Sequence, residues 1–218
     1  MSSKRKLYEI LTHSHINHIH NNQQSNESPS STQTNVQCVD NHIYFYADVN
    51  TETILELNKA ILRLNKDMKN YMDVARCEYN MDVGEVCIYL HINSGGGYIT
   101  DALSGVDTIL KSSIPVISIV EGYVASAATL LSIVCAKRFM TKHSSMLIHQ
   151  LSGGTWGTFE QMKDDMANST YLQKKIKQIY MEYGRGKMKK ERLEKLLTRD
   201  LMMNFKKSKK LGLVDELF

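Results

Sequence analysis

The sequence predicts an α/β fold in which many of the strands pair in parallel. Short apolar stretches rich in β-branched residues alternate along the chain with segments of helical periodicity. Glycines follow several of the strand-like stretches, and this pattern is typical of parallel sheets whose strands are joined by helices. The length of 218 residues, with 42% hydrophobic and 23% charged residues, suits one globular domain plus an appendage, or two small domains.

The first 36 residues are expected to be a polar extension. Between residues 13 and 35 the only large apolar side chains are two isoleucines, and His, Asn, Gln, Ser and Thr make up most of the rest. Such a composition buries too little apolar surface to offset the entropy of ordering. We therefore expect residues 1–36 to be mostly disordered and residues 37–218 to form the folded domain. The four histidines of the extension indicate a low-complexity tract better than a metal site.

The first half of the folded part is expected to alternate strands and helices. In chain order we expect a strand at His42–Val49, a helix at Glu52–Leu64, a strand at Val86–Ile92, a helix at about Thr100–Leu110 and a strand at Pro115–Val120. Three glycines end the second of these strands, and a glycine breaks the third.

The second half is predicted to be mainly helical. In chain order we expect a small-residue helix from about Ser126 to Cys135, a strand at Met146–Ile148, a long helix from Thr158 to Gly184, a basic helix, and a last apolar stretch at Leu213–Leu217. Thr158 and Gln161 have the spacing of a capping box, which is typical of a helix start.

Charge and cysteine content give little support for nucleic-acid, membrane or metal partners. The net charge is +4, and residues 174–210 hold most of the local excess of Lys and Arg. No aromatic stacking platform accompanies these basic residues, so solvated helix faces explain them better than a nucleic-acid surface. No apolar run has the length of a membrane span, and the four cysteines lack zinc-site spacing. We expect a cytoplasmic protein, with an organelle stroma or matrix also open.

A glycine triplet follows one predicted strand. Gly95, Gly96 and Gly97 have no Cβ, so their backbone N–H groups can approach a ligand closely. They could hold a peptide as an added strand and point at a developing oxyanion. A plain glycine turn is the simpler interpretation when the triplet is taken alone.

A serine and a histidine lie at two further strand ends. Ser126 lies between alanines at the start of a predicted helix, where the helix dipole favours negative charge, although a simple N-cap serine is also common. His149 ends a short apolar strand, which is the kind of rigid mount that a general base needs. A structural histidine is the alternative. The order Ser126, His149, Asp200 favours a catalytic interpretation of all three.

Together these segments resemble the Clp peptidase proteolytic subunit family. The matching motifs, in chain order, are Asn93-Ser94-Gly95-Gly96-Gly97, Gly122–Ala128, Leu147-Ile148-His149-Gln150, Arg199-Asp200 and Gly212-Leu213-Val214-Asp215. The resemblance is nearly collinear from about residue 42 to the C-terminus.

The resemblance implies a serine endopeptidase with a Ser–His–Asp triad. It implies these roles: Ser126 as nucleophile, His149 as base, Asp200 as orienting acid, Gly97 and Ala127 as oxyanion-hole donors, and Gly95, Gly96, Gln150 and Leu151 as substrate contacts. The implied fold is the Clp/crotonase α/β type, with the long helix as a projecting handle. No metal or organic cofactor is implied.

The resemblance further implies a chambered assembly. Two seven-membered rings would stack through the handle helices around a chamber that admits short or unfolded peptides, and a separate AAA+ ATPase would supply unfolded chains. Departures from the family pattern lie at Gly95 and Leu151, where prolines are usual, and at Thr198, where many members have an acidic residue.

Three other classes stay open at this point. A crotonase-type acyl-CoA hydratase or isomerase shares the fold and the two-donor oxyanion hole, but a catalytic glutamate is not evident. A Ser–Lys peptidase could use Lys137 or Lys142 but would leave His149 and Asp200 unexplained. A catalytically silent ring subunit is the last alternative, and retention of all three triad residues argues against it.

Overall fold

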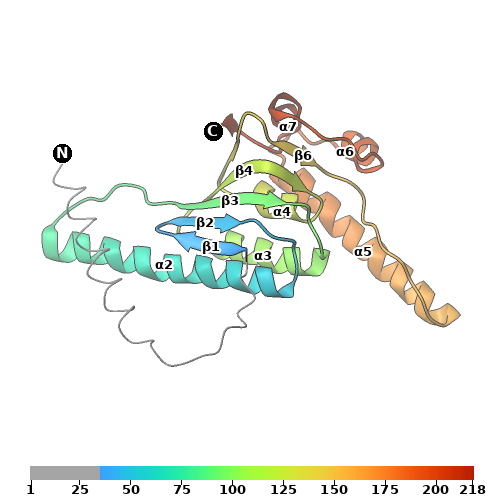
Figure 1. Cartoon of the computed structure of the whole chain (residues 1–218), viewed down its shortest axis with the longest axis horizontal. Helices are drawn as coiled ribbons and strands as arrows, with labels where there is room; N and C mark the ends of the chain where they lie inside the picture. Colours follow the sequence, from blue (N-terminus) through green and yellow to red (C-terminus); the bar gives the residue numbers. More distant parts are fainter. Residues whose placement is uncertain (1–34) are drawn as a thin grey trace. The chain divides into compact units, whose positions relative to one another are not determined.

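A computed structural model describes residues 35–218 and shows helices packed against a mainly parallel sheet (Figure 1). The strands are β1 (Val36–Val39), β2 (His42–Phe45), β3 (Ile88–Ser94), β4 (Val116–Ala125), β5 (Lys137–Met140), β6 (Ser145–Leu147) and β7 (Glu216–Leu217). Their order in the sheet is β1-β2-β3-β4-β5-β7, and β6 pairs with β4 beyond the end of β5. Among the strands named here only β1 and β2 pair antiparallel, and an isolated antiparallel bridge joins Met146 to Met203. The predicted α/β fold with parallel pairing is confirmed.

Helices lie between the strands in the chain, as the alternating pattern predicted. They are α2 (Thr51–Tyr79), α3 (Ile99–Lys111), α4 (Ala128–Ile133), α5 (Phe159–Tyr183), α6 (Lys190–Leu197) and α7 (Phe205–Leu211). α2 and α3 run side by side beneath the strands, and α4 packs on α3 and β4 (Figure 1). The alternation in β2 fits this arrangement, because Ile43 and Phe45 are buried while His42 and Tyr44 between them are only partly buried.

Helix α2 is much longer than predicted. It begins with a capping box, in which the Asn50 side chain accepts from the Thr53 N–H at 3.0 Å, and it runs fifteen residues beyond Leu64. Its apolar spacing continues through partly buried methionines to Ala75, which is fully buried. The helix ends at Asn80, whose φ of 48° lies in the left-handed region that C-terminal caps favour.

Helix α5 projects from the body of the fold, as the handle interpretation expected (Figure 1). Thr158 and Gln161 form the predicted capping box, with the Thr158 N–H donating to Gln161 Oε1 at 2.8 Å. Only Ile176 and Tyr180, in its second half, are buried. The first half of the helix is exposed along its length.

Strand β5 and helix α7 were not predicted. Strand β5 carries the buried Arg138, whose charge hides the strand in a hydrophobicity pattern, and α7 is rich in lysine with only Ser208 and Leu211 buried. None of the helices within residues 35–218 is long and apolar enough to cross a membrane. The predicted extension at residues 1–36 lies, apart from its last two residues, outside the described part of the chain.

Candidate active site

Ser126 occupies a sharp turn between β4 and α4. Its φ is 54°, in the left-handed region that non-glycine residues rarely adopt, and its N–H donates to the Leu147 carbonyl at 2.9 Å. A strained strand-to-helix turn of this kind presents a serine hydroxyl at the edge of a sheet, as in the nucleophile elbow of other hydrolases. The backbone geometry therefore singles out Ser126 beyond an ordinary helix-capping serine.

Room for this turn comes from Gly96, which lies on a different segment. A Cβ on Gly96 would lie 2.7 Å from Ser126 Cβ and 2.8 Å from the Ala125 carbonyl oxygen. In a G-x-S-x-G elbow the glycines stand two residues before and after the serine, whereas here Val124 and Ala128 hold those positions and the glycine is contributed from after β3. The serine and the glycine triplet are therefore two parts of one structure.

Gly97 is held as a short extension of the sheet. The Val49 N–H donates to the Gly96 carbonyl at 2.7 Å, and the Tyr98 N–H donates to the Val49 carbonyl at 2.8 Å. Because backbone groups alternate along an extended chain, the N–H and C=O of Gly97 itself point away from Val49. A Cβ on Gly97 would collide with the Val49 backbone, and its φ of 148° lies outside the usual range of L-residues. This edge is therefore open to a further strand.

Two unpaired backbone donors face the same pocket. Within residues 35–218 neither the Gly97 N–H nor the Ala127 N–H has a hydrogen-bond partner, and both residues line the pocket that contains Ser126. Unpaired N–H groups beside a serine hydroxyl are what stabilisation of a tetrahedral oxyanion requires. Gly95 differs from its neighbours, because a Cβ there would meet no atom within 4 Å.

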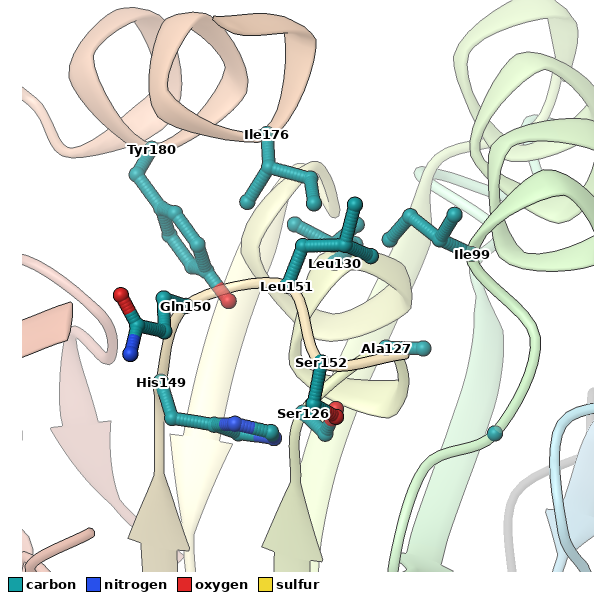
Figure 2. Close-up of a pocket in the computed structure, with 11 residues that line it drawn as sticks. Ile99, Ser126, Ala127, Leu130, His149, Gln150, Leu151, Ser152, Ile176 and Tyr180 are labelled. Atoms are coloured by element: carbon teal, nitrogen blue, oxygen red, sulfur yellow. The ribbon is translucent and has the colours of Figure 1, made fainter. Parts of the chain in front are cut away.

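His149 follows β6 and lies beside Ser126. Figure 2 shows its ring extending toward the Ser126 side chain. Its backbone is fixed from both sides, since β6 pairs with β4 and the following Gln150 N–H donates to the Leu197 carbonyl at 2.7 Å. In the described part of the chain no hydrogen bond joins Ser126 to His149, but both side chains line one pocket.

Asp200 lies near His149 without bonding to it. The distance from His149 Nδ1 to Asp200 Oδ1 is 3.9 Å, longer than a hydrogen bond, and the Asp200 side chain is 78% exposed. In space the three predicted triad residues thus lie next to one another in the expected order, Ser126, His149, Asp200. In this single chain the His149 and Asp200 side chains are close but not hydrogen-bonded to each other.

The other predicted substrate contacts lie on the loop that follows β6. Gln150 and Leu151 both line the pocket, and the Leu151 N–H donates to Gln173 Oε1 of α5 at 2.7 Å. This bond fixes the loop against the handle helix. Gly95 and Gly96 do not line the pocket themselves; they precede Gly97, which does.

The apolar wall of the pocket was missed by sequence reasoning. The lining residues not predicted are Ile99, Leu130, Ser152, Ile176 and Tyr180, which come from α3, α4, the loop after β6 and α5 (Figure 2). Apolar helix residues of this kind cannot be told from core residues in the sequence. The one available signal is the spacing of Ile176 and Tyr180, which places both on the same face of α5. Within residues 35–218 no three His, Cys, Asp or Glu side chains are placed to hold a metal ion.

A strained serine, an adjacent histidine and two unpaired N–H donors on a parallel α/β sheet define a hydrolase of the serine type. Comparison with known proteins agrees. The family model described as Clp protease matches residues 79–218. The ATP-dependent Clp protease proteolytic subunit of Streptococcus mutans is 37% identical over 134 residues, which cover 60% of this chain and 67% of that protein.

The solved structure of a ClpP1 mutant from Listeria monocytogenes has a TM-score of 0.67 at 20% identity, covering 82% of this chain and 91% of that one. The chain belongs to the Clp protease family. The expected family, the Clp/crotonase-type α/β fold and the expected enzyme class, a Clp-type serine endopeptidase, are confirmed. The crotonase-type hydratase or isomerase is not favoured.

Proposed function

We propose that this chain hydrolyses peptide bonds in short or unfolded polypeptides through an acyl-enzyme on Ser126. The observation that carries the proposal is the left-handed turn that places Ser126 in one pocket with His149 and with the unpaired N–H groups of Gly97 and Ala127. Asp200 is the orienting acid.

The proposed chemistry follows the triad template. His149 takes the proton of the Ser126 hydroxyl as its oxygen attacks the substrate carbonyl carbon. The negative charge that develops on the carbonyl oxygen is stabilised by the N–H groups of Gly97 and Ala127. His149 then gives the proton to the leaving amine, and water hydrolyses the acyl-enzyme by the reverse route. None of these steps requires a metal or organic cofactor.

The substrate is proposed to bind as an added strand. The open edge at Gly97 supplies backbone pairing, the adjoining Gly95 and Gly96 line the same edge, and Gln150 with Leu151 contacts the other side of the peptide. Pairing through backbone groups is largely independent of sequence, which suits an enzyme acting on unfolded chains. A substrate side chain next to the scissile bond would enter the pocket and contact its apolar wall, to which Leu130 and Ile176 belong.

Assembly is proposed to complete the triad. Asp200 is followed by two exposed apolar residues, Leu201 and Met202, so this segment has the character of a surface that another copy covers. Covering it would exclude water from the His149–Asp200 contact and shorten it. We propose stacked seven-membered rings joined through α5, supplied by an AAA+ ATPase, in the cytoplasm. The relative from Streptococcus mutans is named as ATP-dependent.

Residues 37–218 are proposed to form the peptidase domain, which β1 extends by one residue to Val36. The Tyr46 N–H donates to the Asn35 carbonyl at 3.1 Å, and β1 begins at Val36, so the cut that preserves every described contact removes residues 1–34. We expect the truncated chain to keep its melting temperature and peptidase activity. A large fall in melting temperature would contradict this boundary.

Fluorogenic peptide hydrolysis by active-site variants tests the proposed roles. We expect Ser126→Ala and His149→Ala to be inactive while sedimenting like the wild type. Asp200→Asn should lose orders of magnitude in kcat, since the imidazole then favours the wrong tautomer. Wild-type rates in Ser126→Ala would refute the assignment.

A further inference from the structure

A chain of two buried hydroxyl groups connects the handle helix to the nucleophile turn. Tyr180 of α5 and Thr129 of α4 are both almost fully buried, and their oxygen atoms are 2.5 Å apart. The Thr129 hydroxyl also lies 2.6 Å from the carbonyl oxygen of Ser126. Both are short distances for neutral hydrogen bonds.

The direction of both bonds follows from the number of available protons. A carbonyl oxygen only accepts, so the one hydroxyl proton of Thr129 goes to Ser126 O. Tyr180 must therefore donate its own proton to Thr129 Oγ1. Burial raises the pKa of Tyr180 above its usual range, although the bond to Thr129 acts in the opposite direction. The phenol thus stays a donor throughout the working pH range of a peptidase.

The carbonyl that receives this bond shares a peptide group with a proposed oxyanion donor. Ser126 C=O and Ala127 N–H are opposite ends of one planar trans peptide. The Ser126 oxygen also accepts from the Thr129 N–H at 3.0 Å. Fixing the oxygen with two donors on one side fixes where the Ala127 N–H points on the other side. Polarising the carbonyl also makes that N–H a stronger donor.

The left-handed turn makes such support necessary. Ser126 has a φ of 54°, so the peptide groups before and after it are held in a relative orientation that a serine does not favour. Helix α4 is only six residues long and adds little by itself. The bonds from Thr129 are therefore the main contacts that hold the Ser126–Ala127 peptide in place.

We propose that Thr129 and Tyr180 are positioning residues that aim the Ala127 N–H at the oxyanion. Through Tyr180, the position of handle helix α5 is coupled directly to the oxyanion hole. The inference rests on the proposed function, in which Ala127 is one of the two donors.

Hydroxyl deletions at the two positions test the proposal. Losing an oxyanion donor costs about 10²–10³ in kcat, so misdirecting one should cost about tenfold to a hundredfold. We expect Thr129→Val to show this loss in kcat with KM close to wild type. Thr129→Ser, which keeps the hydroxyl, should restore kcat. Tyr180→Phe should lose only a few-fold, because Thr129 can still donate.

The affinity for a peptide boronic acid distinguishes a positioning role of Thr129 and Tyr180 from a purely structural one. Its tetrahedral adduct places an oxygen in the oxyanion site, so its affinity should fall in Thr129→Val by the same factor as kcat/KM. The double variant Thr129→Val with Tyr180→Phe leaves no buried hydroxyl unpaired and should fold while showing the same loss. Circular dichroism and sedimentation confirm folding and assembly for each variant.

Ser132 provides the matched control on the same helix. Its buried hydroxyl lies 3.0 Å from that of Ser118, and among the described residues it makes no hydrogen bond to the Ser126 carbonyl. Ser132→Ala should lower stability and leave kcat and boronate affinity unchanged. Wild-type kcat and boronate affinity in the double variant would overturn the inference, as would an equal loss in Ser132→Ala. If wild type itself is not labelled at Ser126 by a serine-directed phosphonate, the proposed function fails instead.

Discussion

Replacing Arg138 with methionine should destabilise the fold by breaking a buried ion pair. The Arg138 side chain is 1% exposed, and it holds Asp215 with two bonds, Nε to Oδ2 at 3.0 Å and Nη2 to Oδ1 at 2.7 Å. Nη1 donates in addition to the Tyr183 carbonyl at 2.8 Å. One side chain therefore ties β5 to the C-terminal segment and to the last residue of the handle helix.

The expected magnitude follows from what the substitution leaves behind. Removing one partner of a fully buried pair costs about 3–5 kcal/mol, because the other charge stays buried without its partner. The Asp215 side chain is 17% exposed, so water partly compensates its charge and lowers the loss. Arg185 Nε, 3.1 Å from Asp215 Oδ1, remains and should keep the loss near the lower end of this range. Methionine retains the length of the arginine stem, so it leaves only a small cavity. In a domain of this size the melting temperature should fall by about 6–20 °C.

The assay is urea or thermal unfolding at pH 7 and a fixed subunit concentration, since assembly shifts apparent stability. Lys137→Met is the matched control. It removes the neighbouring exposed pair, Lys137 Nζ to Glu216 Oε2 at 3.3 Å, which should be worth at most about 1 kcal/mol. If Arg138→Met is no more destabilising than Lys137→Met, the buried pair does not hold the C-terminal segment in the way described.

Three further predictions follow from the same structure. Burial alone would raise the pKa of Asp215, but its bonds to Arg138 and the nearby positive charges lower it below its ordinary value, so it stabilises the fold above the unfolded-state pKa and that stability is lost as pH falls through the folded-state pKa. Asp215→Asn should therefore flatten the acid side of the unfolding free energy measured by urea titration from pH 7 to 3, and an unchanged slope would contradict this. Gly96→Ala should lose at least about tenfold in kcat, because the new Cβ meets the nucleophile turn, whereas Gly95→Ala should keep most activity in the same peptide assay; equal rates would rule out the close approach. The proposed double rings, which would be joined by apolar residues of α5, should survive high salt in sedimentation, while Thr198→Asp should make assembly salt-dependent, since ionic contacts are screened over about 10 Å at 0.1 M. Salt-induced separation of wild-type rings would show that ionic contacts hold them.

The sequence was most informative where the local pattern decides the structure. The capping box at Thr158 marks the start of the handle helix because both of its bonds are local. The end of α2 was misplaced, because Met68 and Met72 continue the apolar face among charged residues that dilute the pattern. Strand β5 was missed, because its buried Arg138 is compensated by Asp215, which is far away in the sequence. Compensation over such a distance has no local signature.

In the candidate site, too, local motifs predicted some residues, while others depend on the folded structure. Ser126 and His149 were found because short motifs at strand ends carry them. Tyr180 and Ile176 were not, because only the folded α5 brings them over the serine. The 3.9 Å separation of His149 Nδ1 from Asp200 Oδ1 could not be predicted either, because short motifs do not determine the distance between two loops.

Covalent labelling of the full chain with a fluorophosphonate, followed by peptide mass spectrometry, tests the central claim most directly. The left-handed turn, the adjacent His149 and the two unpaired N–H donors all act on one hydroxyl, so they predict a single adduct on Ser126. Labelling should be absent in Ser126→Ala and greatly slowed in His149→Ala. An adduct on a different serine, or undiminished labelling of Ser126→Ala, would contradict the assignment of this site.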